Sequence, residues 1–289
     1  NAMASPCEVI IQSADKQFAA ELGNIIATEV WRIEDKYSRY NQYSACGVIN
    51  SNAGNSVDID EETYLLLNFA EQCYQLSDGL FDISSGVLRK AWSFQGVKGS
   101  QGDNDNFPSE AKIKQNLTHV GWRKIKFDQK QITLVKGMEI DFGGIGKEYA
   151  VDRAIILAKK LTNSPVLVNL GGDLAVTNSR LHNEPWQVAI EHPYTNSDQN
   201  KLADMVVSLN SGALATSGDA RRFLINDGKR YSHILNAKTG WPINEAPRSI
   251  TVVAPQCIQA GILATLALLQ GAYAEKFLEE QEIKFWARR

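Results

Sequence analysis

The sequence lacks the features that mark membrane-spanning and nucleic-acid-binding proteins. Its longest apolar run, Ile262 to Leu269, is far shorter than the ~18 residues that a membrane-spanning helix requires. Thirty basic residues against thirty-three acidic ones give a net charge of −3, so the basic excess of a nucleic-acid-binding domain is missing. With 289 residues, of which 44% are hydrophobic and 22% charged, we expect a soluble globular protein of one or two domains, with no nucleic-acid partner and no transmembrane segment.

The cysteines form no recognisable motif. The four of them (Cys7, Cys46, Cys73 and Cys257) include no CxxC pair and show no regular spacing. We expect Cys73 and Cys257 to be small buried core residues, because free cysteine is usually buried. The role of Cys7 stays open, since a cysteine near a mature N-terminus can carry a lipid anchor.

The N-terminus has no secretory signal pattern after Met3. Asn1-Ala2 before Met3 resembles the remnant of a tag, so residues 1–7 are expected to be a tag scar and a tail. If Met3 is the first native residue, a cytoplasmic location follows. If a leader has been removed, the protein would be periplasmic or a membrane-anchored lipoprotein.

The first half of the chain shows helical periodicity and one hairpin. Apolar residues at spacings of three and four predict helices over 15–36 and 60–76. The stretch 94–107 is rich in Gly, Asn and Asp, which predicts a surface loop. A hairpin is expected from 124–127 and 131–135.

From residue 138 onward the pattern becomes strand, glycine turn and helix. A short strand over 138–142 precedes the turn Gly143 to Gly146 and a helix over 147–161. Because strands outnumber helices and only some alternate with them, the fold class is α+β (mixed α and β) with several antiparallel pairs. The other expected elements are strands at 166–170, 186–191, 205–209, 213–217, 223–225, 231–235 and 250–254, a turn at Asp227-Gly228, a helix over 255–269, and a final helix and strand.

The glycine turn from Asp141 to Lys147 matches neither common nucleotide motif. A dinucleotide fingerprint requires a glycine where Tyr149 stands, and a P-loop requires Ser or Thr where Glu148 stands. A glycine turn into a helix N-terminus nevertheless exposes backbone N–H groups that suit a phosphate, and Lys147 adds a positive charge there. A tight strand-to-helix connection is the structural alternative.

Two further segments combine small and polar residues. Gly171-Gly172-Asp173 ends a predicted strand, where two glycines allow close approach of a ligand or of another backbone. Thr216, Ser217, Asp219 and Arg222 bring hydroxyls and charges together, which suits phosphate or metal chemistry. A plain turn with a surface ion pair explains the second segment equally well.

Histidine is scarce, with four in the chain. His233 lies on a predicted strand beside Ser232, where a lone histidine is more often structural than catalytic. A hydrolase of the Ser-His-Asp type finds little support, because no G-x-S-x-G sequence occurs. The remaining three show no metal-ligand spacing and are interpreted as bystanders: His119, His182 and His192.

Taken in order, these segments resemble the FAD:protein FMN transferase family, also called the ApbE family. The resemblance implies a mixed α/β, T-fold-like architecture in which residues 8–289 form one FAD-binding catalytic unit, with two closely packed α/β subdomains as the alternative. Seven ordered blocks carry it: Tyr37 to Tyr40 with Ser44 to Asn50, Asp78 to Asp82, Asp141 to Asp152, Val168 to Asp173, Ala215 to Arg222, Ser232 to Pro242, and Ser249 to Thr265.

The resemblance also implies a reaction and a set of site residues. Typical members use Mg²⁺ to cleave FAD, release AMP and join FMN to a threonine hydroxyl of an acceptor protein, so FAD and that acceptor are the expected partners. His233 is then the candidate general base, because imidazole titrates near neutral pH. The other implied roles are Tyr40 stacking on the isoalloxazine; Leu80, Phe81 and Asp82 lining the flavin pocket; Asp141 and Lys147 on the adenylate or pyrophosphate side; Gly171, Gly172, Asp173, Thr216, Ser217 and the Leu235 backbone around FAD; Asp219 and Thr265 in catalysis; and Gly144 and Thr265 at the metal.

The sequence departs from the family pattern at the metal site. The family has Asp four residues before the Thr that stands here as Thr265, and this chain has Gly261. Because Mg²⁺ prefers carboxylate oxygen, the change is expected to weaken metal binding unless Asp173 or Asp219 compensates. Ala45 and Gly47 also replace the usual Glu and Ser. The alternatives are a non-catalytic FAD-binding homologue and an FAD pyrophosphatase that gives FMN and AMP.

Overall fold

The centre of the fold is a six-stranded antiparallel sheet with the order β1-β5-β6-β9-β12-β13. The computed structural model describes residues 1–3, 5–94, 107–191, 205–219 and 222–289. The strands of this sheet are β1 (Cys7–Ile11), β5 (Val166–Leu170), β6 (Asp173–Val176), β9 (Gly212–Gly218), β12 (Ser249–Ala254) and β13 (Phe285–Arg288).

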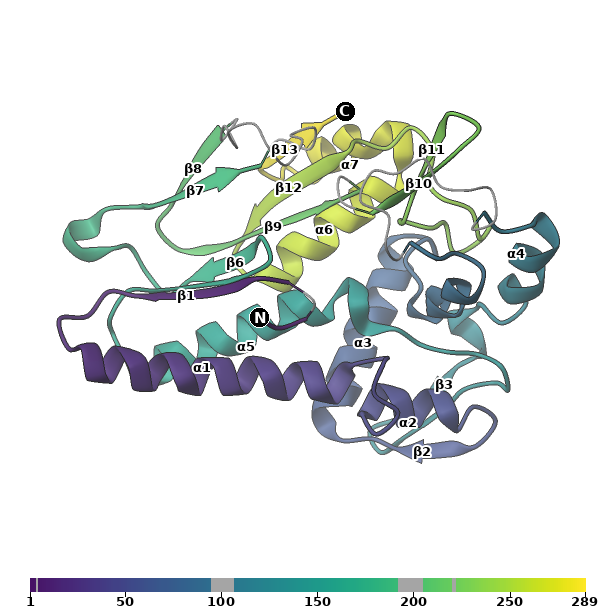
Figure 1. Ribbon diagram of the computed structural model, residues 1–289, viewed down its shortest axis with the longest axis horizontal. Helices are drawn as coiled ribbons and strands as arrows, with labels where there is room; N and C mark the ends of the chain where they lie inside the picture. Colours follow the sequence, from purple (N-terminus) through teal and green to yellow (C-terminus); the bar gives the residue numbers. More distant parts are fainter. Residues whose placement is uncertain (4, 95–106, 192–204, 220–221) are drawn as a thin grey trace.

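Helices cover one face of this sheet. α5 (Gly146–Leu161) and α6 (Cys257–Leu269) pack on the strands, and α1 (Lys16–Tyr37) lies along α5 (Figure 1). α6 is apolar around most of its circumference because it is enclosed between the sheet, α5 and α7 (Ala274–Glu280). The two helices therefore meet in the centre of the main hydrophobic core.

The opposite face of the sheet is covered by a two-stranded pair, β7 (Trp186–Ile190) and β8 (Met205–Leu209). Buried and exposed residues alternate along β7, as expected for a strand with one face in the core. The apolar side chains of this pair form a second hydrophobic cluster with Leu167, Leu174 and Leu214 of the main sheet.

A second group of elements lies beside the helical layer, on the right of Figure 1. Within this group, an aromatic cluster around Trp92, including Phe107, Tyr231 and Trp241, packs the residues after η1 against the β10–β11 hairpin. Its elements are α2 (Ala45–Ser51), α3 (Glu61–Leu76), η1 (Ile83–Lys90), α4 (Glu110–Leu117), η3 (Trp122–Lys124), the small sheet β2 (Ser56–Asp58), β4 (Gln131–Thr133), β3 (Lys126–Phe127), and the hairpin β10 (Phe223–Asn226) and β11 (Lys229–Ser232); short 3-10 turns η4 (Phe142–Gly144), η5 (Leu181–Asn183) and η6 (Gly271–Tyr273) complete the chain.

Most of the predicted elements are confirmed, and with them the mixed α and β class. Asp15 and Asp60 cap α1 and α3 by accepting hydrogen bonds from Phe18 N–H and Thr63 N–H, each at 3.0 Å. The hairpin at Asp227-Gly228 forms as expected. Cys73 and Cys257 are buried, at 2% and 0% exposure.

The strand predicted over 138–142 is wrong. The backbone of Ile140 pairs instead with the side chain of Asn50, which accepts from its N–H at 2.7 Å and donates to its carbonyl at 2.9 Å. The N–H of Asp141 donates to the carbonyl of Ile83 at 2.9 Å. An apolar run alone does not show whether its backbone partners come from a strand or from side chains.

Other boundaries differ from the prediction by a few residues. β11 ends at Ser232, and Leu235 makes only an isolated bridge to Pro242. α6 begins at Cys257 and not at Pro255, because the N–H groups of Cys257 and Ile258 are capped by Asp152 at 2.8 and 2.9 Å. β1 and β6 were not predicted. β1 begins at Cys7, the last residue assigned to the tail.

Two expectations concern residues outside the described ranges: the loop over 94–107, of which 95–106 are not described, and His192. Within the described residues, no helix combines the length and the hydrophobicity needed to span a membrane.

Candidate active site

The glycine turn is held by Asp141. Its Oδ1 accepts a hydrogen bond from Gly143 N–H at 2.9 Å, and its carboxylate forms an ion pair with Arg39. Gly86 of η1 lies against it so closely that a Cβ at Gly86 would be 2.6 Å from Asp141 Cβ. Arg39, η1 and the glycine turn therefore meet at one carboxylate, and the turn leads directly into the N-terminus of α5.

Tyr40 lies at the rim of this region with 70% of its surface exposed. Its hydroxyl accepts a hydrogen bond from Arg39 Nη2 at 2.8 Å, and the Arg39 guanidinium lies 4.9 Å from the ring centroid. Arg39 thus connects the Tyr40 ring to Asp141. An exposed aromatic ring held in this way suits stacking, and its contact with isoalloxazine stays a prediction.

The segment Leu80 to Asp82 comes to the glycine turn from another part of the chain. Phe81 is buried, and a Cβ added to Gly144 would lie 3.2 Å from its ring. The Asp82 carboxylate accepts hydrogen bonds from Ser84 N–H at 2.8 Å and from Trp122 N–H at 2.9 Å, so it anchors η1 and η3. The predicted contact of this segment with flavin is untested.

Lys147, in the first turn of α5, forms an ion pair with Asp173 at the start of β6. Burial lowers the pKa of Lys147, but the charges of Asp173 and Glu148 outweigh it, so the pKa lies above its usual value. The other carboxylate oxygen of Asp173 accepts from Thr216 N–H at 3.0 Å. Asp173 therefore joins α5 to β9.

Gly171 and Gly172 have a backbone role in the structure. With φ of +67° and +104° they form the tight turn between β5 and β6, a conformation that favours glycine. A Cβ at Gly172 would meet nothing within 4 Å, so the space beside it is open. Their predicted contact with FAD is untested.

Hydroxyl groups continue the site from β9 to α6. Thr216 Oγ1 lies 2.8 Å from Thr251 Oγ1 of β12, and Thr265 Oγ1 donates to Ser217 Oγ at 3.1 Å. The Thr216 backbone N–H therefore lies against the Lys147–Asp173 pair, and Ser217 and Thr265 meet on the side of the sheet that faces α6. Because side chains alternate along a strand, the Thr216 hydroxyl lies on the opposite face. The structure brings together residues that are 118 positions apart in the sequence, from Lys147 to Thr265.

Glu148 is the residue that sequence reasoning missed. It was used only to reject a P-loop, yet it faces α6, where a Cβ on Gly261 would lie 2.5 Å from Glu148 Cγ. Burial and the nearby Asp173 carboxylate raise the pKa of Glu148. The sequence does contain a signal for it, because spacings of three and seven residues place Glu148 on the same face of the helix as the apolar residues Val151 and Ile155, which are buried.

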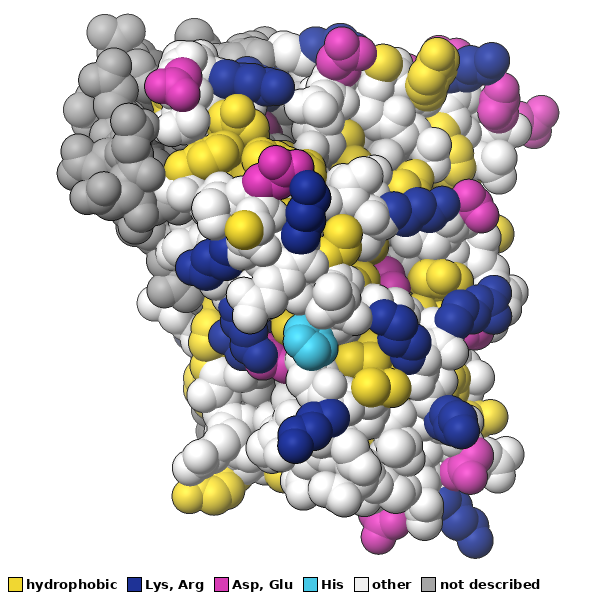
Figure 2. All heavy atoms as spheres, turned by 90° about the vertical axis from the view of Figure 1, so that its right-hand side faces the viewer, with side chains coloured by type: hydrophobic (Ala, Val, Ile, Leu, Met, Phe, Trp, Pro, Cys, Tyr) yellow, Lys and Arg dark blue, Asp and Glu magenta, His cyan; other side chains and the backbone are white. Residues whose placement is uncertain are grey.

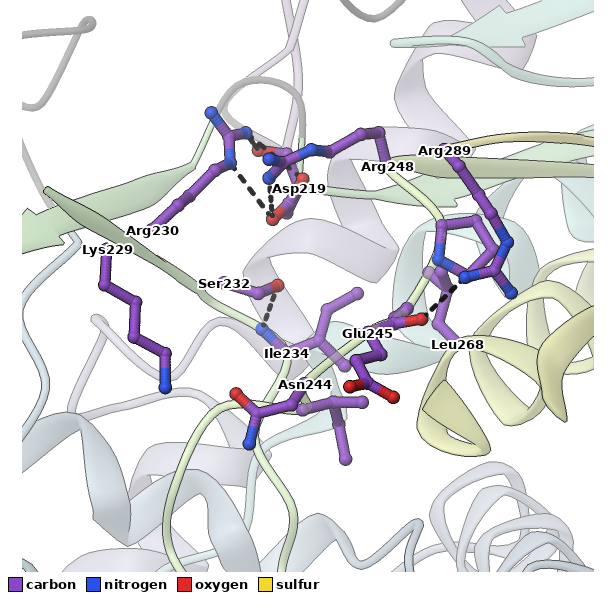
Figure 3. A pocket seen from close by; sticks show the side chains of 13 residues that line it. Asp219, Lys229, Arg230, Ser232, Ile234, Asn244, Glu245, Arg248, Leu268 and Arg289 are labelled. Atoms are coloured by element: carbon purple, nitrogen blue, oxygen red, sulfur yellow. Dashed lines mark hydrogen bonds and ion pairs between the residues drawn. The ribbon is translucent and has the colours of Figure 1, made fainter. Parts of the chain in front are cut away.

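A cavity of about 580 Å³ opens beyond the end of β9 (Figure 3). Arg230 and Arg248 converge there on Asp219, with N–O distances of 3.1 and 3.4 Å. Leu268 lines the same cavity and lies just under one helical turn after Thr265. The cavity is therefore beside the hydroxyl groups of Thr265 and Ser217. Because Asp219 forms ion pairs with two arginines, its carboxylate is fixed in place at the wall of the cavity.

His233 follows Ser232, which also lines the cavity. Its Nδ1 lies 3.1 Å from the carbonyl oxygen of Arg222. Because a carbonyl can only accept, the Nδ1 atom is the donor, and a neutral ring then has its lone pair on Nε2. Burial lowers the pKa of His233 below its usual value, which favours the neutral ring.

The predicted site residues fall into two adjoining groups. Lys238, in the block that follows His233, pairs with Asp78 at 2.8 Å and so ties this block to the segment that carries Phe81. The first group, around the glycine turn and α6, contains Tyr40, Leu80, Phe81, Asp82, Asp141, Gly144, Lys147, Gly171, Gly172, Asp173, Thr216, Ser217 and Thr265. The second contains Asp219, which lines the cavity, and His233 and the Leu235 backbone, whose neighbours Ser232 and Ile234 line it.

On the face shown in Figure 2, the described Lys and Arg side chains are spread among hydrophobic ones and do not merge into one basic patch.

Comparison with known proteins gives consistent results. The model of the ApbE family matches residues 3–286. The FAD:protein FMN transferase of Haemophilus influenzae is 28% identical over 257 residues, which cover 87% of this chain and 70% of the relative. The crystal structure of the ApbE protein of Thermotoga maritima is 29% identical, with a TM-score of 0.87 and coverage of 99% and 92%. The flavinyl transferase ApbE of Pseudomonas stutzeri is 26% identical, with a TM-score of 0.83 and coverage of 99% and 88%.

Proposed function

Because this chain belongs to the ApbE family, we propose that it is an FAD:protein FMN transferase, which cleaves FAD, joins FMN to a threonine hydroxyl of an acceptor protein and releases AMP. The observation that carries the proposal is the Lys147–Asp173 pair. It joins the glycine turn to the hydroxyl groups of β9 and α6, and so unites blocks that are far apart in the sequence.

The glycine turn suits the pyrophosphate of FAD. The first N–H groups of α5 have no partner within the helix and carry the positive end of its dipole, which favours an anion. Lys147 places a positive charge in the same turn. Tyr40 presents an exposed ring on the other side of Asp141, and Phe81 lies on Gly144, which supports placing the flavin ring at this end.

His233 serves as the general base of the transfer step. The threonine oxygen attacks the phosphorus on the flavin side of the pyrophosphate, the bond to the AMP phosphate breaks, and AMP leaves. The threonine proton passes to Nε2 of His233, because the carbonyl of Arg222 keeps the ring proton on Nδ1. Asp219 is assigned to positioning, since it orders Arg230 and Arg248 at the adjoining cavity.

The residues present fit a hard divalent cation such as Mg²⁺. Gly144 offers a backbone carbonyl and Thr265 a hydroxyl, and oxygen donors of this kind are what Mg²⁺ prefers. Glu148, whose side chain occupies the space beside Gly261, has a buried oxygen, Oε2, with no hydrogen-bond partner among the described residues. When bound, the cation would neutralise charge that develops on the pyrophosphate. The described residues contain no cluster of three or more His, Cys, Asp or Glu side chains arranged for a metal.

The test is incubation with FAD and Mg²⁺ together with a protein or peptide that carries a flavinylation motif. We expect equal amounts of AMP and of flavin bound to the acceptor threonine. FMN and AMP in solution with no labelled acceptor would instead indicate a pyrophosphatase. Tight FAD binding with neither product would indicate a non-catalytic binding protein.

A further inference from the structure

α5 and α6 meet at a contact between a glycine and a glutamate. A Cβ on Gly261 would lie 2.5 Å from Cγ and 2.6 Å from Oε1 of Glu148, well inside the distance that atoms tolerate. The two helices contact each other and both pack on the central sheet (Figure 1). Glycine at 261 is therefore the condition for the Glu148 side chain to enter the space beside α6.

The charges around Glu148 do not balance. Lys147 and Asp173 form an ion pair, so the positive charge nearest to Glu148 is already matched. Glu148 Oε2 is buried and has no hydrogen-bond partner within the described parts of the chain. An unpaired buried carboxylate is costly, and a cation bound to it would remove that cost.

The other carboxylates nearby are occupied. Asp173 accepts from Thr216 N–H and pairs with Lys147, and Asp152 caps the first turn of α6. Asp219 is held by Arg230 and Arg248. Asp173 Oδ2 also accepts no hydrogen bond within the described residues, but it lies in the ion pair with Lys147. Of these four acidic side chains, Glu148 is therefore the one with a buried oxygen that has neither a hydrogen bond nor an ion pair among the described residues.

We propose that Glu148 supplies the carboxylate ligand of a divalent cation at this site, next to the hydroxyl of Thr265. Gly261 and Thr265 are four residues apart and share one face of α6, so the carboxylate that contacts Gly261 lies about one helical turn from this hydroxyl. The ligand thus reaches the site from α5, across the helix interface. The choice of Mg²⁺ as the natural cation rests on the proposed function.

The experiment measures cation binding without FAD or acceptor. Mn²⁺ is used as the probe, because free Mn²⁺ is counted directly by its paramagnetic resonance signal, and Mg²⁺ is then used to displace it. The variants are E148Q, which removes the charge and keeps the volume, and the exchange E148G/G261D, which moves the carboxylate to α6. The control is E184Q, which removes an exposed carboxylate far from the site. Circular dichroism and thermal unfolding verify that each variant is folded.

We expect wild type and E184Q to bind one Mn²⁺ that Mg²⁺ displaces, and E148Q to bind it on the order of tenfold more weakly or worse. The exchange variant is expected to recover most of the affinity, because it restores a carboxylate to the same space. Equal affinity of E148Q and wild type, or no binding by wild type, would overturn the proposal. If Mn²⁺ binding depends on Glu148 but no AMP is released, the transferase is refuted and the metal site stands. If AMP is released but E148Q binds Mn²⁺ as wild type does, the metal site is refuted and the transferase stands.

Discussion

Lys147 and Asp173 form an ion pair that connects the two glycine turns of the site. Asp173 is almost entirely buried, with a side-chain exposure of 2%, whereas Lys147 keeps 27%. The pair has a structural role, because it fixes the start of α5 on β6 and β9. It also leaves the lysine partly accessible from the side where the glycine turn opens.

Replacing Lys147 by Met should both destabilise the fold and impair FAD binding. Removing the partner of a buried carboxylate costs about 3–5 kcal/mol, and we expect the lower end because Lys147 is partly exposed. Urea unfolding of K147M measures this loss. Flavin fluorescence measures the loss of FAD affinity.

The double variant K147M/D173N separates the two effects. It removes both charges of the pair and so does not leave Asp173 without its partner; it should therefore be more stable than K147M, while FAD binding stays weak. If the two variants unfold at the same urea concentration, the ion pair does not carry the stability assigned to it.

Replacing Gly261 by Ala should destabilise the protein, although alanine is the better helix former. Helix propensity alone would favour Ala by about 1 kcal/mol. The new Cβ would meet Glu148 at 2.5 Å, and overpacking of this kind costs about 1–3 kcal/mol. Thermal unfolding of G261A is the measurement, and a lower midpoint is expected.

An E148A background provides the matched control for that substitution. With Cγ and the carboxylate removed, the same Gly261→Ala change should become neutral or stabilising. An equal loss in both backgrounds would mean that something other than Glu148 occupies the space beside Gly261.

Much of the fold could be predicted from local patterns, and the failures share a cause. Helices α1, α3 and α5 and the Asp227-Gly228 hairpin depend on periodicity, caps and turn residues that are close in sequence. The region 138–142 was misjudged because its backbone partners, Asn50 and Ile83, lie far away in the chain. Partners that are distant in the sequence leave no pattern among the residues next to the segment that they bind.

The site residues divide in the same way, into those that local sequence indicates and those that depend on contacts between distant parts of the chain. The glycine turn and Asp173 stand out because their residue types suggest chemistry even in isolation, whereas Thr265 was indicated by the resemblance to the family. Glu148 did not stand out, since its significance comes from the glycine that faces it on α6. A missing carboxylate at position 261 and a buried glutamate at 148 are two observations that only a three-dimensional contact can join.

Stability at low pH should depend on Glu62. Its carboxylate accepts hydrogen bonds from Arg32 Nη2 at 2.8 Å, Lys36 Nζ at 2.6 Å and the Tyr149 hydroxyl at 2.8 Å, and so ties α1, α3 and α5 together. The hydrogen bond from Arg32 is the main cause that lowers the pKa of Glu62 from 4.5 to about 2. A lowered carboxyl pKa stabilises the fold above pH 4.5, and this contribution is lost as the pH falls from 4.5 toward 2.

Urea unfolding of wild type, E62Q and the exposed neighbour variant E61Q across this pH range tests the prediction. E62Q should be less stable than wild type at pH 6, and the difference should shrink as the pH falls toward 2. E61Q should follow wild type. A difference for E62Q that stays constant with pH would show that Glu62 is not held in its charged form by these partners.

Replacing His233 by Ala should abolish FMN transfer and leave FAD binding nearly unchanged. The ring is held by the Arg222 carbonyl and packs against Phe94, while its neighbours Ser232 and Ile234 line the cavity, so its Nε2 can accept the threonine proton without contributing to the pyrophosphate contacts. Because the pKa of His233 is lowered, the transfer rate of wild type should stay level above neutral pH and fall only in the acidic range, below the usual pKa of 6.5, as the ring becomes protonated. The measurements are flavin transferred to the acceptor as a function of pH and FAD affinity by fluorescence. Undiminished transfer in H233A would remove His233 from the mechanism, and a parallel loss of FAD affinity would make it a binding residue.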